Sequence, residues 1–456
     1  MRRVVKVSRI RIIITIIVVV LTTLLTGCTG KEPNEIAYVV ALGIDSTDDD
    51  NYKITIQYAN TTQISGGASE SGGKAGSEIV DNVTIEAPNI YAGVGLANNI
   101  VSKSFSMSHA KLIVFSKEIA EKGVKDMIET LVRSEEIRPD VFIAVANTTA
   151  NDYLTSVNPE MEVNPAQYYQ LIYQKNQLVG IPDGQLREFF TGLYTDNYDS
   201  ILPVAGVIEG SGGNSQNDDK GQSKDSQNEG SEGSSESLDS FESKSSDDKD
   251  ENEKEKDAEK NTSKYEYDIK NYVGGETAIE KKNKAEAIGA AVFEKDKMVG
   301  ELGEVETEIC KMLKGDYTYS YLTYYNNDTP DIPITVKTTQ QKKPKYKIDT
   351  DKKTVDIELY IESDLYSLPA DYNVENKIED FERDVANYTS SACTEFINNF
   401  TKKYNSDILK LNEKVKYKFL TNNQYNWFKK NVGWSEYKFS VCTNFKVRRT
   451  GLIVRE

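Results

Sequence analysis

The sequence predicts a multi-domain α+β protein: a mixed sheet with helices in an N-terminal domain, a small middle domain, and an antiparallel sheet with a long amphipathic helix in a C-terminal domain. Strand-like and helix-like segments alternate before residue 207, a polar stretch follows, and alternating strands with a helix fill the C-terminal part. We place a signal peptide at 1–27, the N-terminal α/β domain at 28–207, a linker at 208–284, the middle domain at 285–336 and the C-terminal domain at 337–456.

The first 27 residues have the composition of a secretory signal peptide, with five basic residues before an apolar run at 12–25. As a helix, these 14 residues would cover roughly 21 Å, less than the roughly 30 Å of a bilayer core. The run ends in Leu25, Thr26, Gly27 and Cys28, which resembles a lipobox, so we predict lipidation of Cys28. The alternative is an ordinary cleavage site that happens to precede a cysteine.

In the N-terminal domain, continuous or alternating apolar residues predict strands at 36–44, 54–58, 111–115 and 141–146. Helical periodicity predicts helices at 90–102, 118–133, 149–157 and 165–178, the last with Asn164 and Pro165 as its start signal. Elements that alternate in this way are typical of an α/β layer with some parallel pairing.

The predicted linker cannot form a core. Between residues 211 and 260 it contains 16 acidic residues and 7 lysines and only three apolar residues. Its charge of −9 is more than half of the formal net charge of −17 for the whole chain. We predict a disordered acidic segment, and a partner-binding tail is the alternative. The net negative charge argues against a nucleic-acid partner.

The middle domain is predicted as a hairpin over 287–300, a short helix at 304–313 and a tyrosine-rich strand at 317–325. In the C-terminal domain, Val355, Ile357, Leu359 and Ile361 alternate with charged residues, which predicts an antiparallel strand with one buried face. Apolar residues then recur every three or four positions over 374–400, as in a long amphipathic helix. A helix at 425–432 and a final strand at 437–447 complete the domain.

Few residues are candidates for chemistry, and we predict that the protein is not an enzyme and holds no cofactor or metal. His109 is the chain's one histidine, and we expect it to be structural. Asp45 is the best single candidate for acid/base chemistry among the carboxylates, but we expect it to accept backbone hydrogen bonds.

Apart from Cys28, the cysteines are Cys310, Cys393 and Cys442. Buried free thiols are the favoured state, and a Cys393–Cys442 bridge is the alternative. Arg448, Arg449 and Gly451 form either a carboxylate-pairing motif or a docking motif for a partner or for anionic headgroups.

Several segments together resemble the Ger(x)C family of spore germination lipoproteins, the C subunits of GerA-type germinant receptors. They are the lipobox at Cys28 and the segments 35–45, 108–115, 288–300 and 448–453. The order and spacing of these segments carry the resemblance, which covers nearly the whole chain after residue 27. The sequence departs from the family at Thr29, where a Trp-Asp pair often follows the lipidated cysteine, and in its longer acidic linker.

The resemblance implies a three-domain, lipid-anchored and non-enzymatic protein on the outer face of the spore inner membrane. It implies membrane-spanning A and B subunits as partners, and a role in receptor assembly and the signalling of germination. It does not imply that this subunit contacts the nutrient. The alternatives are a solute-binding lipoprotein of an importer, which would need two similar lobes around a cleft, and an envelope enzyme built around His109.

Overall fold

The computed structural model describes residues 13–18, 35–49, 51–59, 80–158, 162, 164–174, 180–195, 197–208, 271–277, 283–326, 329–367, 377–404 and 406–450. Cys28, Gly451 and most of the predicted linker lie outside these residues. Residues 1–209 and 271–456 form one compact unit. In the part of the chain that the structure describes, no helix is long and apolar enough to cross a membrane.

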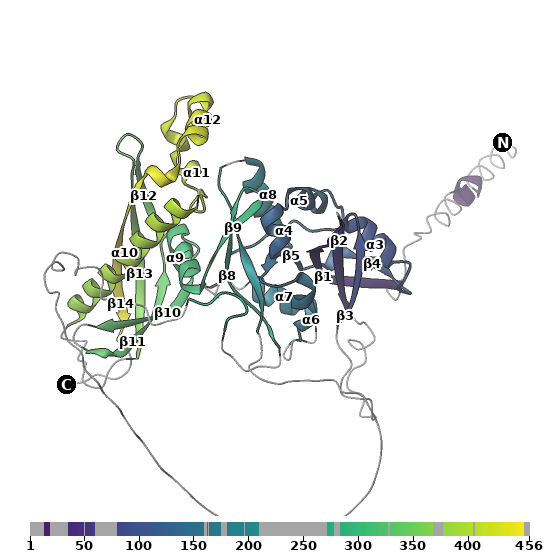
Figure 1. Ribbon diagram of the computed structural model, residues 1–456, viewed down its shortest axis with the longest axis horizontal. Coiled ribbons are helices and arrows are strands. Elements are labelled where there is room, and N and C mark those ends of the chain that lie inside the picture. The colour runs from purple at the N-terminus through teal and green to yellow at the C-terminus, as the bar shows by residue number, and fades with distance from the viewer. Residues whose placement is uncertain are drawn as a thin grey trace, which may run out of the picture. The chain divides into compact units, whose positions relative to one another are not determined.

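The first half of the fold is a nine-stranded mixed sheet with the order β3-β2-β1-β5-β6-β7-β8-β9, and β4 pairs with β1 outside this path (Figure 1). The pairs β1-β5, β5-β6 and β6-β7 are parallel, whereas β2, β3, β8 and β9 are antiparallel to their neighbours. The strands are β1 (Ile36–Ser46), β2 (Tyr52–Ala59), β3 (Val80–Ala87), β4 (Ser104–Ser106), β5 (Leu112–Ser116), β6 (Phe142–Ala146), β7 (Ile201–Val207), β8 (Ala285–Glu294) and β9 (Lys297–Leu302).

Helices cover both faces of this sheet. One core cluster joins the sheet to α3, α4, α5 and α8, and a second joins the opposite face to α6 and α7. The continuous apolar sequences of β5 and β6 follow from this, because each successive side chain points into one of the two cores. The helices are α3 (Ile90–Ala97), α4 (Lys117–Lys122), α5 (Lys125–Val132), α6 (Ala150–Ser156), α7 (Pro165–Gln174) and α8 (Leu186–Thr195).

The second half is a five-stranded sheet with the order β10-β11-β13-β12, in which β14 pairs with β13. The long helix α10 packs against β14, and α9 packs against β8, β13 and α10. The strands are β10 (Tyr319–Asn326), β11 (Thr329–Gln340), β12 (Lys345–Asp349), β13 (Thr354–Ser367) and β14 (Lys438–Arg449). The helices are α9 (Glu304–Lys314), α10 (Ile378–Lys403), α11 (Leu411–Val415) and α12 (Asn422–Asn431), with the short 3₁₀ helices η2 (Met107–His109), η3 (Lys416–Lys418) and η4 (Trp434–Glu436).

The predicted α+β class is confirmed, and several details differ from the prediction. The helix expected at 118–133 is two helices, because Gly123 ends α4 with a φ of 124°. The helix expected at 90–102 ends at Ala97, and the Asn98 side chain then accepts a hydrogen bond from the Phe105 amide at the start of β4 (2.8 Å). The strands β3, β4, β7, β11 and β12 and the helices α8 and α11 were not predicted.

The range predicted as a middle domain is divided between the two sheets. Its hairpin, β8 and β9, extends the first sheet because β8 pairs with β7, whereas β10 and β11 belong to the second sheet. The second sheet is also not wholly antiparallel. Because α10 carries the chain back across the sheet after β13, β14 runs parallel to β13.

Candidate functional site at the junction of the two sheets

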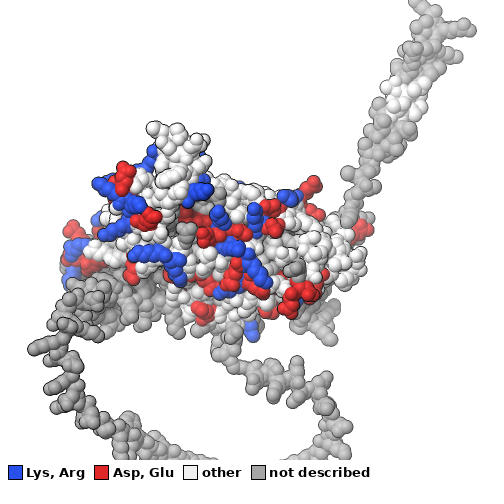
Figure 2. Space-filling view, turned by 45° about the horizontal axis from the view of Figure 1, so that its top comes forward, with Lys and Arg blue, Asp and Glu red and all other residues white. Residues whose placement is uncertain are grey.

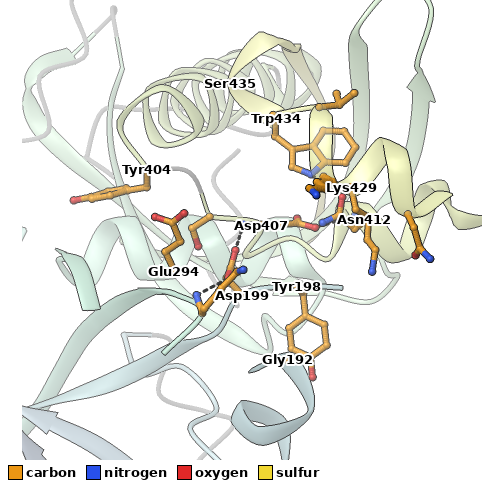
Figure 3. A pocket seen from close by; sticks show the side chains of 16 residues that line it. Gly192, Tyr198, Asp199, Glu294, Tyr404, Asp407, Asn412, Lys429, Trp434 and Ser435 are labelled. Atoms are coloured by element: carbon orange, nitrogen blue, oxygen red, sulfur yellow. Dashed lines mark hydrogen bonds between the residues drawn. The ribbon is translucent and has the colours of Figure 1, made fainter. Parts of the chain in front are cut away.

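A cleft of about 480 Å³ opens where the first sheet meets the C-terminal elements (Figure 3). One wall comes from α8, the segment before β7 and the β8–β9 turn. The other comes from the segment after α10, from α11, and from α12 with η4. The side chains that line the cleft include Tyr198, Asp199, Asp407, Asn412, Lys429 and Trp434.

A reciprocal contact between Asp199 and Asp407 lies at the floor of the cleft (Figure 3). The Asp199 amide donates to the Asp407 carbonyl oxygen (3.1 Å), and the Asp407 amide donates to Oδ2 of Asp199 (2.8 Å). The other carboxylate oxygen of Asp199 accepts from the Lys295 amide in the β8–β9 turn (2.9 Å). One side chain therefore fixes two chain segments that are about 100 and 200 residues away from it in sequence.

The Asp407 carboxylate has a structural role of its own. Its two oxygens accept from the amides of Leu411 and Asn412 (2.8 Å each), so it caps the first turn of α11. Burial raises the pKa of Asp407 to about 7 and also raises the pKa of Asp199. Because backbone amides occupy both oxygens of each carboxylate, neither is placed as a general base; protonation of Asp407 would instead change how this junction is held.

Three further polar contacts join the two halves at the junction. The Ser406 hydroxyl donates to the Phe293 carbonyl oxygen (2.9 Å). Lys410 forms an ion pair with Glu188 (3.2 Å), and its ammonium lies 4.1 Å from the centre of the Tyr198 ring. The Asn197 amide oxygen accepts from the Tyr425 hydroxyl (3.1 Å) and the Lys429 ammonium (3.2 Å) of α12.

An apolar core lies beneath these polar contacts. One cluster combines Ile201, Ala290, Val292 and Leu302 of the first sheet with buried residues of α9, α10, α12 and the second sheet. The junction is therefore a packed interface with hydrogen-bonded edges, and it holds the two halves in a defined arrangement.

A second cleft of about 420 Å³ lies beside the first and shares Tyr198 and Asp199 with it. Lys311 of α9 reaches into it, is 6% exposed, and donates to the Ile181 carbonyl oxygen (3.0 Å). Burial lowers the pKa of Lys311 to about 8 and raises the pKa of the nearby Asp183. Sequence reasoning missed Lys311, Asp199 and Asp407. The one available signal was a lysine on the apolar side of the α9 pattern, between Cys310 and Met312.

The residues singled out in the sequence are not brought together. His109 lies in η2, exposed, with a 3.0 Å hydrogen bond between its Nδ1 and the Ser108 hydroxyl and an edge contact with Tyr38 (4.8 Å). Arg448, near the end of β14, forms an ion pair with Glu362 of β13. Arg449 lies opposite Asp364 in the strand register. Cys28 and Gly451 fall outside the described residues.

Asp45 accepts backbone hydrogen bonds, as predicted, but not from its own turn. Its oxygens accept from the amides of Ala150 and Asn151 (2.6 and 3.0 Å) and cap α6, which begins about 100 residues later.

Cys310, Cys393 and Cys442 are free thiols. Cys310 and Cys393 are buried, but the expected burial of Cys442 is wrong, because this residue points outward from β14. The described residues contain no group of three or more His, Cys, Asp or Glu residues that could hold a metal ion.

Comparison with curated proteins finds relatives in spore-forming bacteria. The chain is 26% identical over 174 residues to "Spore germination protein KC" of Bacillus subtilis (strain 168), which is 35% of this chain and 42% of the relative. It is 28% identical over 145 residues to "Putative spore germination protein YfkR" of the same organism, or 32% and 37% of the two chains. The matches therefore span less than half the length of these relatives.

A solved structure entitled "Crystal Structure of the GerBC protein" aligns over 89% of this chain and 96% of its own, with 15% sequence identity and a TM-score of 0.47. The model "Spore germination protein N-terminal domain" matches residues 30–207, and "Spore germination B3/ GerAC like, C-terminal" matches residues 288–451. Because these two models follow one another over more than half of the sequence, the chain belongs to the Ger(x)C family of spore germination proteins.

Proposed function

We propose that this chain is a non-enzymatic subunit of a nutrient germinant receptor, anchored by a lipid on Cys28 to the outer face of the spore inner membrane. The observation that carries the proposal is the match of both family models, in order, to the two folded parts of the chain. The lipobox at residues 25–28 supports the anchor, because a diacylglycerol supplies two acyl chains for stable attachment.

The state of the carboxylates supports a role without catalysis. The buried carboxylates Asp45, Asp199 and Asp407 each accept two backbone amide hydrogen bonds. Such groups stabilise loops and helix starts and are not free to take a proton from a substrate. In this proposal, the membrane-spanning A and B subunits are the partners, and the chain contributes to assembly of the receptor and to its signalling.

The experiment replaces Cys28 with alanine at the chromosomal locus, with Cys442→Ala as the matched control. Cys442 is the exposed free thiol of β14, so its loss tests the general effect of removing an accessible cysteine. We expect Cys28→Ala to lose the lipid by mass spectrometry, to leave the membrane fraction, and to reduce germination of spores on a panel of nutrients. We expect the control to behave as the parent chain does.

Co-purification distinguishes the receptor from the importer. A receptor subunit purified from solubilised spore membranes should bring multi-spanning A and B subunits with it, whereas a solute-binding lipoprotein should bring a permease. An unmodified Cys28, or a Cys28→Ala chain that stays tethered and germinates normally, would overturn the anchor. A permease without the other receptor subunits would overturn the receptor role.

A further inference from the structure

The segment 414–435 differs in charge from the rest of the chain. It contains five lysines and no aspartate or glutamate, within a chain of formal net charge −17. It also contains both tryptophans of the chain, Trp427 and Trp434. It begins within α11, covers η3 and α12, and ends in η4. A basic segment in an acidic protein indicates a surface that meets negative charge.

Three large apolar side chains of this segment point into solvent. Leu420 is 95% exposed, Tyr417 93% and Trp427 64%, and we call these three residues the apolar tip. Among the described residues, Leu420 and Tyr417 are the most exposed large apolar side chains. Single exposed apolar residues are ordinary on protein surfaces. Three of them within eleven positions of one charged segment indicate a binding surface.

The tip stands on a packed base. The ring of Phe419 lies 5.9 Å from that of Tyr425 and 4.9 Å from that of Phe428, and Phe428 contacts Trp434 at 5.9 Å. Tyr425, Phe428 and Trp434 belong to the core cluster beneath the junction. Because these inward-facing aromatic rings fix η3 and α12, Tyr417, Leu420 and Trp427 are held outward by the fold.

Lysines surround the tip. Lys416 and Lys430 are at the surface, whereas the Lys418 ammonium donates to the Ile348 carbonyl oxygen and Lys429 is directed to Asn197 at the junction. In Figure 2, the end of the molecule that carries α12 shows uncharged surface, with blue Lys and Arg side chains and some red Asp and Glu side chains next to it. Trp and Tyr side chains favour the headgroup level of a bilayer, and surface lysines are attracted to anionic lipids.

A protein partner fits this surface less well than a bilayer does. A stable protein interface buries about 800 Å² on each partner around a central apolar patch. Here the exposed face of α12 beside the tip is polar, with Asn422, Asn423, Gln424 and Asn426. Three projecting apolar side chains with lysines around them are sufficient to enter the interfacial layer of a membrane, which needs no matching surface.

We propose that the apolar tip inserts into the headgroup region of a bilayer that contains anionic lipids, while Lys416 and Lys430 contact the phosphates. This gives the chain a membrane contact formed by the C-terminal half of the fold, separate from any lipid on Cys28. The contact does not depend on the receptor role.

The test uses the full chain reconstituted into vesicles with equal parts of phosphatidylcholine and phosphatidylglycerol, in which brominated acyl chains quench nearby tryptophan. In a Trp434→Phe variant, Trp427 is the one remaining tryptophan. We expect its emission to shift to the blue and to be strongly quenched. The reciprocal Trp427→Phe variant leaves only Trp434, which is 8% exposed, and its emission should not change. Each of the substitutions Lys416→Gln and Lys430→Gln should weaken insertion of the tip by roughly fivefold.

A second measurement keeps the test valid if Trp434→Phe perturbs folding. Leu420→Cys carries an environment-sensitive nitrobenzoxadiazole label, and Ile100→Cys, at a site 69% exposed in the turn after α3, is the matched control. Both variants also contain Cys442→Ser, which removes the exposed thiol. We expect a blue shift for the label at 420 and none at 100.

The proposal would be overturned if vesicles change neither the emission of the label at 420 nor that of Trp427. Shielding of Trp427 from iodide only when other receptor subunits are added, without bromine quenching, would show a protein contact instead. Neither readout involves germination, so failure here leaves the proposed function untouched.

Discussion

The two sheets of this protein bury their side chains in different ways. In β5, Ile113 and Phe115 enter one core and Leu112 and Val114 enter the other, and all four are 0% exposed. In β14 of the second sheet, alternate residues are buried under α10 and the others are exposed. The first sheet is therefore closed on both faces at its central strands β5 and β6, whereas the second has one face covered by α10 and one open face.

This difference separates a rigid part from a part that presents a surface. A sheet with two cores tolerates few changes on either face, because every side chain is packed. The open face of the second sheet instead carries side-chain pairs such as Arg448 with Glu362 and Ser440 with Asp356 (2.6 Å). Between the two lies the junction, where the contacts of Asp199 and Asp407 lie beside a shared apolar core.

The largest effect is expected from placing the same polar residue on the two sheets. Val114→Asn buries an amide in the first sheet and should lower the free energy of unfolding by about 4–6 kcal/mol, through lost apolar burial and an unpaired polar group. Cys442→Asn in β14 points into solvent and should change it by less than about 0.5 kcal/mol. Guanidinium unfolding followed by circular dichroism measures both. Equal losses would contradict the distinction between a closed and an open sheet.

The next largest effect is the pH dependence of the free energy of unfolding that the junction produces through Asp407. An unburied carboxyl of this type titrates near 3.8, and burial raises the pKa of Asp407 to about 7. Between these values the folded protein holds a proton that the unfolded chain has released. The free energy of unfolding should therefore fall as pH rises from about 4 to about 7, by about 2–4 kcal/mol for this group, and stay level above.

The variant Asp407→Asn should remove this part of the decline, as measured by unfolding at several pH values. Burial also raises the pKa of Glu308 in α9 to about 7, so a smaller decline should remain, and it should shrink further in the double variant with Glu308→Gln. A decline that is the same in Asp407→Asn as in the parent chain would show that Asp407 does not carry this pH dependence.

A buried hydrogen bond in the first sheet should have a smaller effect. Tyr169 donates to the Gln57 amide oxygen (2.5 Å), whose amide nitrogen donates to the Leu154 carbonyl oxygen (2.9 Å), and both side chains are 0% exposed. Tyr169→Phe leaves the Gln57 oxygen unpaired and should cost about 1–3 kcal/mol. Tyr360→Phe in β13, where the hydroxyl accepts from Lys345 (2.8 Å) at the surface, is the matched control and should leave the unfolding midpoint unchanged. Adding Gln57→Leu to Tyr169→Phe should recover part of the loss, since both partners are then apolar.

The elements that the sequence predicted well are those with one clear period. The alternation in β13 and the three-to-four residue spacing of α10 are visible without tertiary information, because burial on one face produces them. β3 was missed because its burial alternates only weakly along an edge strand. The helix α8 was missed because its apolar face forms only against α5 and the first sheet, and β8 was placed apart from β7 because some 80 residues separate them in sequence.

The junction could not be predicted from the sequence in the same way. Asp199 and Asp407 stand among ordinary loop residues, and their contact depends on a long-range approach between two sheets. Asp45 was predicted to be an acceptor of backbone hydrogen bonds because aspartate commonly follows a strand in this role. Its partner, the start of α6, was not predictable, because it depends on β1 lying next to β5 in the sheet order.

The smallest effect is expected at Arg448 on the open face of the second sheet. Its ion pair with Glu362 lies in solvent, where salt screens the attraction and the side chains lose entropy on pairing, so Arg448→Gln should leave the unfolding midpoint unchanged. If pairing within the sheet is the whole role of Arg448, spores that carry this variant should germinate at the parental rate, as should spores with Glu362→Gln. Reduced germination in Arg448→Gln but not in Glu362→Gln, with equal stability of both chains, would instead assign the end of β14 to partner docking, because only the arginine could then be making a contact outside the subunit.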